Sequence, residues 1–145
     1  MVSLRKISEK DRQMLSERFH MSSDAAKRLI DQSDASLFQD RFFEMYVISV
    51  GSISVGAISL FAHSSSVVSI GPEVFEEHRR HGYATAAMKM AMKLACEKGY
   101  TRIRQQIRVN NLASIKLHTR LGFETDGQIY KNRNQNEVLI YWKSL

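Results

Sequence analysis

A basic turn with small residues lies between two apolar stretches of the sequence, at residues 75–85. Gly82 and Ala84 would let the backbone approach a ligand closely. Three basic side chains stand beside these small residues: Arg79, Arg80 and His81. If a helix begins after Gly82, its unpaired N–H groups and its positive dipole end face the same spot, which favours an anion. The turn therefore suits a pyrophosphate, with an ordinary helix entry as the alternative.

Two further polar residues, Asn111 and His118, fall on one stripe of a predicted helix. They stand at positions i and i+7, with Ile115 between them at i+4. The rise from Asn111 to His118 is about 10 Å, so the two side chains can contact different parts of one extended ligand. The alternative is that Asn111 caps the helix and that His118 packs in the core with both nitrogens hydrogen-bonded.

Positive charge is concentrated in the second half of the chain. Residues 1–75 carry 8 Lys or Arg against 9 Asp or Glu, and residues 76–145 carry 13 against 6. Part of this excess is a row of arginines on one face of a predicted strand: Arg102, Arg104 and Arg108. The row indicates either a solvated basic face or an anionic partner. No aromatic residues interleave with it, which argues against nucleic acid as the main partner.

Composition limits the class of protein. The chain has 145 residues, of which 43% are hydrophobic and 25% charged, and we expect a single globular domain over residues 1–145. No apolar run approaches the roughly 20 residues of a membrane span, and the charged N-terminus does not resemble a signal peptide. Cys96 is the only cysteine, so a cytoplasmic location fits best. We expect its thiol to be buried or half-buried.

The elements that must position these side chains follow from the periodicity of the apolar residues. Alternation and short apolar runs predict strands at residues 2–7, 41–50, 53–61, 67–75, 101–109, 123–126 and 137–142. Caps and glycine stops predict helices after Ser8, after Ser22 or Ser23, and over residues 85–98 and 112–121. Gly51 and Ser52 suit a two-residue hairpin turn. This order predicts an α/β fold with a mixed, twisted sheet flanked by about four helices.

Two segments together resemble the GNAT superfamily of N-acetyltransferases. Residues 79–84 match its Arg/Gln-x-x-Gly-x-Gly/Ala signature. Asn111-x-x-Ser114-x-x-Leu117, followed by Leu121-Gly122-Phe123, is similar to its second motif. The segment Gly71-Pro72-Glu73-Val74 looks closest to the branch of ribosomal-protein N-terminal acetyltransferases. The resemblance covers nearly the whole chain and implies the GNAT fold.

The resemblance also implies that the chain binds acetyl-CoA. The turn of residues 79–84, with Thr85, would hold the pyrophosphate of coenzyme A through main-chain N–H groups. The strand backbone at Val74 would pair with the pantetheine arm, and Asn111 would bond that arm farther along. The cofactor-binding residues expected on this basis are Val74, Arg79, Arg80, His81, Gly82, Tyr83, Ala84, Thr85 and Asn111. We expect no metal ion.

In this family a neutral amine attacks the thioester directly, which calls for a base, an oxyanion donor and an acid for the leaving thiolate. The family usually has Tyr as the acid after the position of Leu117, where this chain has His118. The resemblance implies that His118 protonates the thiolate or only bonds the thiol. Glu73 is the expected base, directly or through a water, with His63 and His78 as alternatives.

The expected function is therefore acetyl-CoA-dependent transfer of an acetyl group to a primary amine. The alternatives are a catalytically weak acyl-CoA-binding relative, a basic nucleic-acid-binding module, and transfer of a larger acyl group. In GNAT proteins the first two helices and the last hairpin shape the acceptor pocket, here residues 19–38 and 129–137. These stretches carry no signature, so a small-molecule or peptide amine remains open. The resemblance also allows a homodimer.

Overall fold

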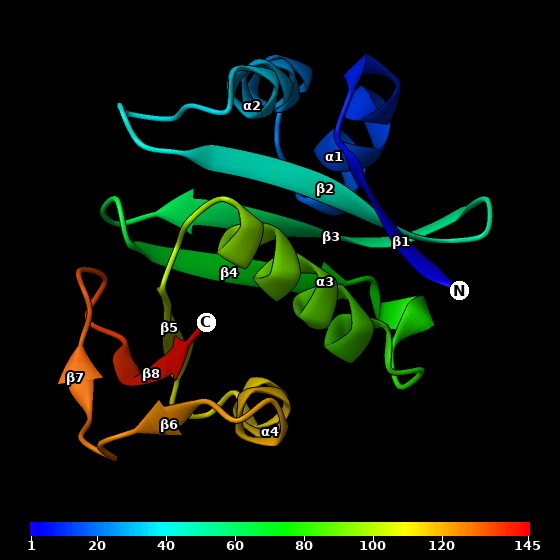
Figure 1. The fold of residues 1–145 in the computed structure, drawn as a ribbon. Coiled ribbons are helices and arrows are strands. Elements are labelled where there is room, and N and C mark those ends of the chain that lie inside the picture. Colours follow the sequence, from blue (N-terminus) through cyan, green and yellow to red (C-terminus); the bar gives the residue numbers. More distant parts are fainter.

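A single sheet of eight strands runs through the protein (Figure 1), and the structure, a computed structural model, describes residues 1–145. The strands are β1 (Val2–Lys6), β2 (Phe43–Val50), β3 (Ile53–Ala62), β4 (Val67–Val74), β5 (Arg102–Arg108), β6 (Glu124–Thr125), β7 (Tyr130–Lys131) and β8 (Glu137–Ser144). Their order is β1-β2-β3-β4-β5-β8-β6, and β7 also pairs with β8. Only the β4–β5 pairing is parallel.

Four α-helices cover this sheet: α1 (Arg12–Arg18), α2 (Ser23–Ala35), α3 (Tyr83–Glu97) and α4 (Leu112–Arg120). Two short 3-10 turns precede α1 and α3, at Glu9–Asp11 and Glu76–His78. The predicted α/β fold, with a mixed sheet and four helices, is confirmed. None of the helices combines the length and the apolar character that a membrane span requires.

The first half of the sheet is covered on both faces, α1 and α2 lying on one side and α3 on the other (Figure 1). Strand β2 shows this in its alternation, because Met45 and Val47 pack in the cluster of α1 and α2. Tyr46 and Ile48 belong to the cluster that contains α3. A strand that is buried on both faces has a nearly continuous apolar sequence, as β2 does.

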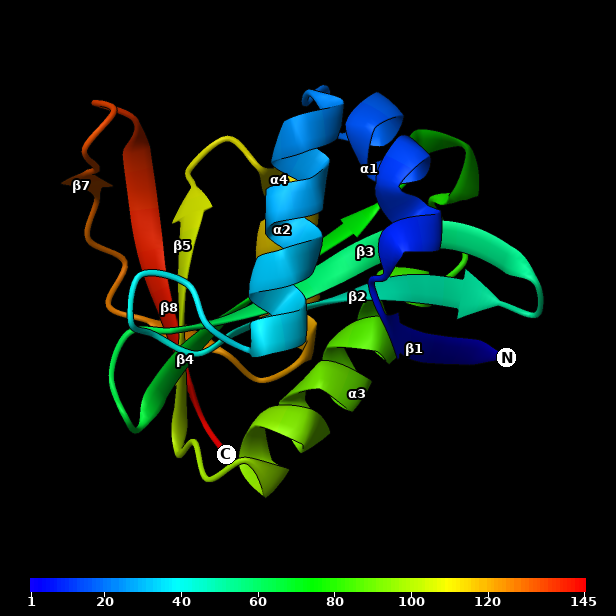
Figure 2. The same ribbon diagram turned by 90° about the horizontal axis from the view of Figure 1, so that it is seen from above.

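The sheet splits between β4 and β5. These strands pair only at Val67 with Arg102 and at Val68 with Ile103. Farther along, the side chain of Gln105 takes the place of a strand neighbour and bonds the backbone of Ile70. Figure 2 shows β5 and β8 turned steeply against β2 and β3, so the strands separate toward the carboxyl end of β4. We call this opening the fork.

Two features differ from the sequence predictions. Strand β7 was not predicted, because Tyr130 and Lys131 lie in a polar segment and owe their strand form to pairing with β8. The expected burial of Cys96 is wrong, because its thiol belongs to an exposed residue. Small residues such as Ala91 and Ala95 form the buried stripe of α3, and Cys96 follows about 100° beyond that stripe.

A buried carboxylate joins three elements at the far end of the sheet from the fork's mouth. Glu44 on β2 is 5% exposed. Ser36, just after α2, and Tyr46 donate hydrogen bonds to it, at 2.6 and 2.5 Å. Lys6 and Lys98 place their ammonium groups 3.4 Å from its oxygens. Burial alone would raise the pKa of Glu44, but these partners outweigh burial and hold the pKa below its ordinary value.

Glu44→Gln is expected to lower the free energy of unfolding at pH 7 by about 1–3 kcal/mol, because two lysines lose their shared carboxylate. A carboxyl group whose pKa is lower in the folded state contributes stability that is present above its unfolded pKa and is lost on acidification. The wild type should therefore lose stability more steeply than the variant as the pH falls below about 4.5. Urea unfolding of both proteins from pH 7 to pH 3 measures this, and parallel curves would contradict it.

Candidate active site

A cleft of about 640 Å³ lies where the end of β4, the start of α3 and the start of α4 meet. It is lined by most of the predicted site residues: Glu73, Val74, Arg79, Arg80, Gly82, Tyr83, Ala84, Thr85 and Asn111. The structure thus brings together two segments that are far apart in the sequence. Arg120, from the last turn of α4, lines the same cleft and was not predicted. The predicted residues His81 and His118 do not line it.

The turn before α3 presents a row of free hydrogen-bond donors. Arg80 and Gly82 have left-handed backbones, with φ of +67° and +79°, and Gly82 is the N-cap of α3 without a side-chain cap. The main-chain N–H groups of residues 80–85 have no acceptor within the protein. Such a concave row at a helix N-terminus binds anions. The turn therefore has the geometry that the sequence predicts for an anion site.

The side chain of His81 lies outside this anion site, although its main-chain N–H belongs to the row of free donors. Its ring stacks on Tyr83, with 5.3 Å between the ring centroids and 14° between the planes. Its Nδ1 lies 3.1 Å from the carbonyl oxygen of His78. Both contacts hold the turn itself, so His81 supports the shape of the turn from the outside.

The edge of β4 at the fork carries free backbone groups. Ile70 directs its N–H and C=O toward Gln105, so the alternation of a strand directs those of Pro72 and Val74 to the same edge. Pro72 has no N–H to leave unpaired there. The Val74 carbonyl accepts a hydrogen bond from Nε of Arg79 at 3.0 Å. The Val74 N–H stays available to a ligand that lies along this edge.

Gly56 fixes how closely β3 approaches this part of β4. A Cβ atom at Gly56 would lie 2.2 Å from the carbonyl oxygen of Glu73 and 2.9 Å from Cα of Val74. Any side chain at this position would therefore displace the backbone of Glu73 and Val74.

Asn111 combines the two functions that the sequence left as alternatives. Its Oδ1 accepts a hydrogen bond from the N–H of Ser114 at 3.2 Å, so it caps α4. It also lines the cleft, and its amide NH₂ group has no acceptor within the protein. Capping by one end of the amide leaves the other end free to donate to a ligand.

His118 is buried in the fork behind the cleft, with 2% of its surface exposed. Its Nδ1 lies 2.7 Å from the carbonyl oxygen of Ser114, so Nδ1 carries the proton and donates. Its Nε2 lies 3.0 Å from Nε2 of Gln105 and accepts from that amide. Burial lowers the pKa of His118 and outweighs the hydrogen bond to Ser114, which raises it. A neutral ring with both nitrogens engaged favours a structural role over the acid role.

We expect nitrogen NMR of the imidazoles at pH 7 to show His118 protonated on Nδ1 and bare on Nε2, with a pKa below 6.5. Because the unfolded chain binds a proton near pH 6.5 and the buried ring does not, the free energy of unfolding should fall as the pH drops below 6.5. His118→Gln should remove that part of the pH dependence. A His118 ring that is charged at pH 7 would contradict this assignment and restore the acid role.

Two of the three expected bases lie at the cleft. Glu73 is exposed at its edge, 3.4 Å from the guanidinium of Arg79. His78 also lines the cleft. His63 lies elsewhere, with its Nε2 2.6 Å from Oγ of Ser69 on β4. Glu73 is thus the carboxylate placed beside the open edge of β4.

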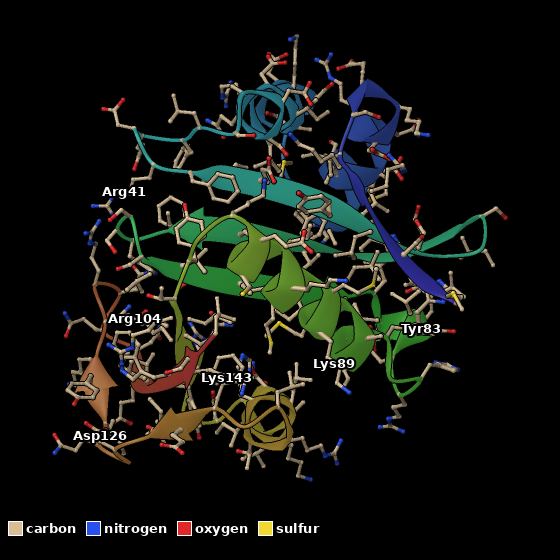
Figure 3. All side chains as sticks on the ribbon, in the orientation of Figure 1. Arg41, Tyr83, Lys89, Arg104, Asp126 and Lys143 are labelled. Atoms are coloured by element: carbon tan, nitrogen blue, oxygen red, sulfur yellow. The ribbon has the colours of Figure 1, made fainter.

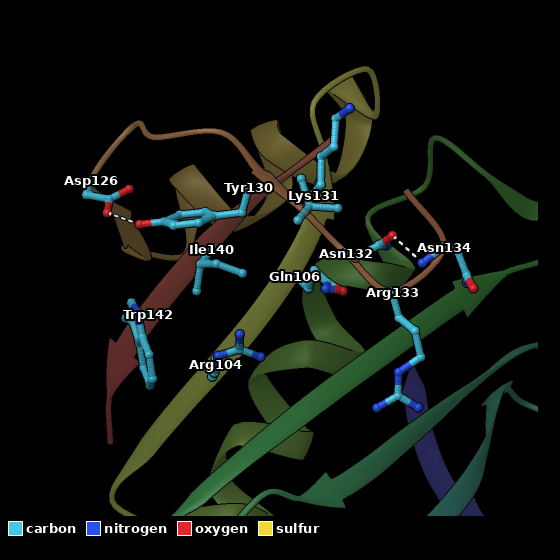
Figure 4. Close-up of a pocket in the computed structure, with 11 residues that line it drawn as sticks. Arg104, Gln106, Asp126, Tyr130, Lys131, Asn132, Arg133, Asn134, Ile140 and Trp142 are labelled. Carbon is cyan, nitrogen blue, oxygen red and sulfur yellow. Dashed lines mark hydrogen bonds between the residues drawn. The ribbon is translucent and has the colours of Figure 1, made fainter. Parts of the chain in front are cut away.

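Two more cavities continue from the cleft. A smaller one, of about 380 Å³, occupies the fork around His118 and shares Pro72 and Ser114 with the cleft. A larger one, of about 710 Å³, lies on the outer face of β5 and β8 (Figure 4) and shares Gln106 with the fork cavity. The sequence pointed to neither. For the fork cavity, the sequence holds one indication. Gln105 stands on the apolar face of β5, and a buried amide needs hydrogen-bond partners.

Comparison with known protein families identifies the family of this chain. The family model described as Acetyltransferase (GNAT) domain matches residues 2–124. The chain belongs to the GNAT acetyltransferase family. Comparison with the curated proteins by sequence finds no match.

Solved GNAT structures share the fold at low sequence identity. RimL, a ribosomal-protein alpha-N-acetyltransferase solved with coenzyme A, superposes with a TM-score of 0.85 at 17% identity, covering 99% of this chain and 94% of that one. Spermidine N-acetyltransferase from Vibrio cholerae, solved with CoA and spermine, gives 0.83 at 15% identity, covering 99% and 95%. A putative acetyltransferase from Salmonella typhimurium with acetyl-CoA gives 0.80 at 17%, covering 100% and 94%.

Proposed function

We propose that this protein is an N-acetyltransferase that uses acetyl-CoA to acetylate a primary amine. The observation that carries the proposal is the row of unpaired N–H groups at residues 80–85, in one cleft with the open edge of β4. GNAT neighbours solved with CoA or acetyl-CoA support it. The single cysteine agrees with action in the cytoplasm.

The residues of the cleft fit two parts of coenzyme A, the pyrophosphate and the pantetheine arm. The N–H groups of residues 80–85 bind the pyrophosphate, with Arg79, Arg80 and Arg120 adding positive charge. The free edge of β4 at Val74 pairs with the pantetheine arm, in the way that a peptide adds to a sheet edge. The free amide of Asn111 donates to the same arm. When bound, acetyl-CoA supplies the acetyl group as a reactive thioester.

The chain's own groups then act on the amine. Glu73 accepts the proton of the attacking amine, directly or through a water, beside the open end of β4. The thiolate that leaves takes its proton from water, since both nitrogens of His118 are engaged within the protein. His118 keeps the fork in shape by fixing Gln105 against Ile70. His118 is thus a positioning residue.

An acetyl-transfer assay tests the proposal. The purified protein is incubated with acetyl-CoA and a panel of amines that contains N-terminal peptides, polyamines, aminoglycosides and amino acids. We expect release of free thiol that depends on both substrates, with acetylated product seen by mass spectrometry. Binding of acetyl-CoA without transfer to any amine would make the chain a non-catalytic acyl-CoA-binding relative. Faster turnover with a longer acyl-CoA would mean that the protein transfers a group larger than acetyl.

A further inference from the structure

The outer face of β5 and β8 forms a basic cavity that the proposed chemistry does not use (Figure 4). Its cationic lining comes from three side chains: Arg104, Lys131 and Arg133. Asp126 is the only carboxylate among the residues that line it. Amides and apolar residues, including Gln106 and Trp142, complete the wall. The cavity is large enough for several residues of an extended ligand, at about 710 Å³.

The positive charge of this cavity is not neutralised within the protein. No carboxylate oxygen lies within 4.0 Å of a side-chain nitrogen of Arg104, Lys131 or Arg133. Asp126 turns its carboxylate to the hydroxyl of Tyr130, at 2.7 Å, and to the N–H of Gln128, at 2.9 Å. The single negative group is thus held by neighbours of its own loop, and the three cations remain free for an external anion.

A fourth cation reinforces the same region. Burial lowers the pKa of His63, and Arg104 and Arg41 lower it further, so both guanidinium groups act on the space beside the β3–β4 turn. Figure 3 shows Arg41 and Arg104 on the same side of the molecule, with Tyr83 on the opposite side. The positive region therefore extends from the cavity toward Arg41, beside the β3–β4 turn.

This cavity lies next to the fork, beside the place where acetyl transfer is proposed. It shares Gln106 with the fork cavity, and the fork cavity shares Pro72 and Ser114 with the cleft. The basic cavity thus adjoins the fork cavity, and the fork cavity adjoins the cleft. A ligand whose amine reaches the fork from the outer face has the rest of its length in the basic cavity.

We propose that the acceptor is a peptide that carries acidic residues next to its amino terminus, a proposal that rests on the acetyltransferase function above. The N-terminal amine enters the fork, and the following carboxylates pair with Arg104, Lys131 and Arg133. Exposed Ile129 and Tyr130, on the loop beside the cavity, supply apolar contact to the peptide. Polycationic acceptors such as polyamines and aminoglycosides are repelled by the same lining.

The aromatic ring of the cavity favours a peptide over a nucleic acid. Trp142 is covered by the guanidinium of Arg102, which lies 4.0 Å from the ring centroid, and Arg104 lies 6.0 Å from it. Arg102 already stacks on this ring, so the ring offers a base one free face at most. Carboxylates need no aromatic face, because the guanidinium groups of Arg104 and Arg133 line the cavity.

Trp142 is the only tryptophan of the chain, so its fluorescence reports on this cavity directly. The protein is titrated with three amidated peptides that share an N-terminal alanine: Ala-Asp-Glu-Asp, Ala-Gln-Asn-Gln and Ala-Lys-Arg-Lys. We expect the acidic peptide to bind at least tenfold more tightly than the neutral one, with affinity that falls as salt is raised. Equal or tighter binding of the basic peptide, of spermidine or of a single-stranded oligonucleotide would overturn the proposal.

Substitutions of the arginines that line the cavity test where the acidic peptide binds. Arg133→Gln and Arg104→Gln should each weaken the acidic peptide about tenfold, since each removes a charge-assisted hydrogen bond. Arg108→Gln is the matched control, because Arg108 is exposed on the same face of β5 and does not line the cavity. Circular dichroism verifies that all three fold. An undiminished acidic preference in both Arg104→Gln and Arg133→Gln would overturn the proposal.

Thiol release with the same peptides separates this inference from the function on which it rests. Acidic-peptide binding without acetyl transfer to any amine would reject the transferase function. Acetyl transfer that prefers spermidine or the basic peptide would reject the acidic acceptor and leave the transferase in place. The expected result is a kcat/KM for the acidic peptide at least tenfold above that for the neutral one.

Discussion

Gly82→Glu is expected to weaken the binding of acetyl-CoA at least 100-fold. Gly82 lies within the row of unpaired N–H groups at residues 80–85 and is the N-cap of α3. A glutamate there brings its carboxylate to the donors that are proposed to hold the pyrophosphate. Repulsion between two unit charges about 4 Å apart near a protein surface amounts to about 4 kcal/mol, and 100-fold in affinity corresponds to about 2.7 kcal/mol. Isothermal titration calorimetry measures the loss.

The matched control is Gly51→Glu. Gly51 also has a left-handed backbone, with φ of +61°, and a Cβ atom would meet nothing within 4 Å at either glycine. Both substitutions therefore carry a similar backbone strain, but Gly51 lies in the β2–β3 turn, away from the cleft. Gly51→Glu should bind acetyl-CoA like the wild type. Equal losses in the two variants would mean that the effect comes from the backbone and not from the anion site.

Glu73→Gln is expected to lower kcat about 100-fold and to change acetyl-CoA binding less than threefold. The amide keeps the shape of the side chain and can no longer take a proton, so general-base catalysis is lost while the cleft is kept. Loss of the carboxylate also releases Arg79 from a contact of 3.4 Å, which is exposed and contributes little to stability. Steady-state thiol release and calorimetry on the same preparations measure the two effects.

Glu76→Gln is the control for this substitution. Glu76 is an exposed carboxylate three residues along the chain, in the 3-10 turn before α3, and does not line the cleft. Its kcat should equal that of the wild type. If Glu73→Gln also keeps full activity at every pH, the proton passes to another group, and His78, which lines the cleft, is the next residue to replace.

The anion site could be predicted from the sequence because its determinants are local. A glycine, small neighbours and basic residues directly before an amphipathic helix specify a turn with free N–H groups, whatever packs around them. Asn111 was predicted for a related reason, since a helix cap depends on neighbouring residues. The direction of the His81 side chain could not be predicted, because its stacking on Tyr83 depends on side-chain packing.

The fork and the basic cavity could not be predicted, because both depend on contacts between distant strands. Gln105 bonds Ile70, 35 residues away, and the amide of Gln105 also donates to Nε2 of His118. The cavity forms only once β7 and its loop fold back against β8. Periodicity identified the strand with the arginine row, but only the pairing of β5 with β8 brings Arg104 opposite Trp142.

Calorimetric titration of the wild-type protein with acetyl-CoA, in parallel with S-acetylpantetheine, tests the central claim most directly. The two ligands share the thioester and the pantetheine arm, and only acetyl-CoA carries the pyrophosphate. The geometry at residues 80–85 predicts binding of acetyl-CoA in the micromolar range and of S-acetylpantetheine at least 100-fold more weakly. Equal affinity for the two ligands, or no heat with acetyl-CoA at high protein concentration, would contradict the claim.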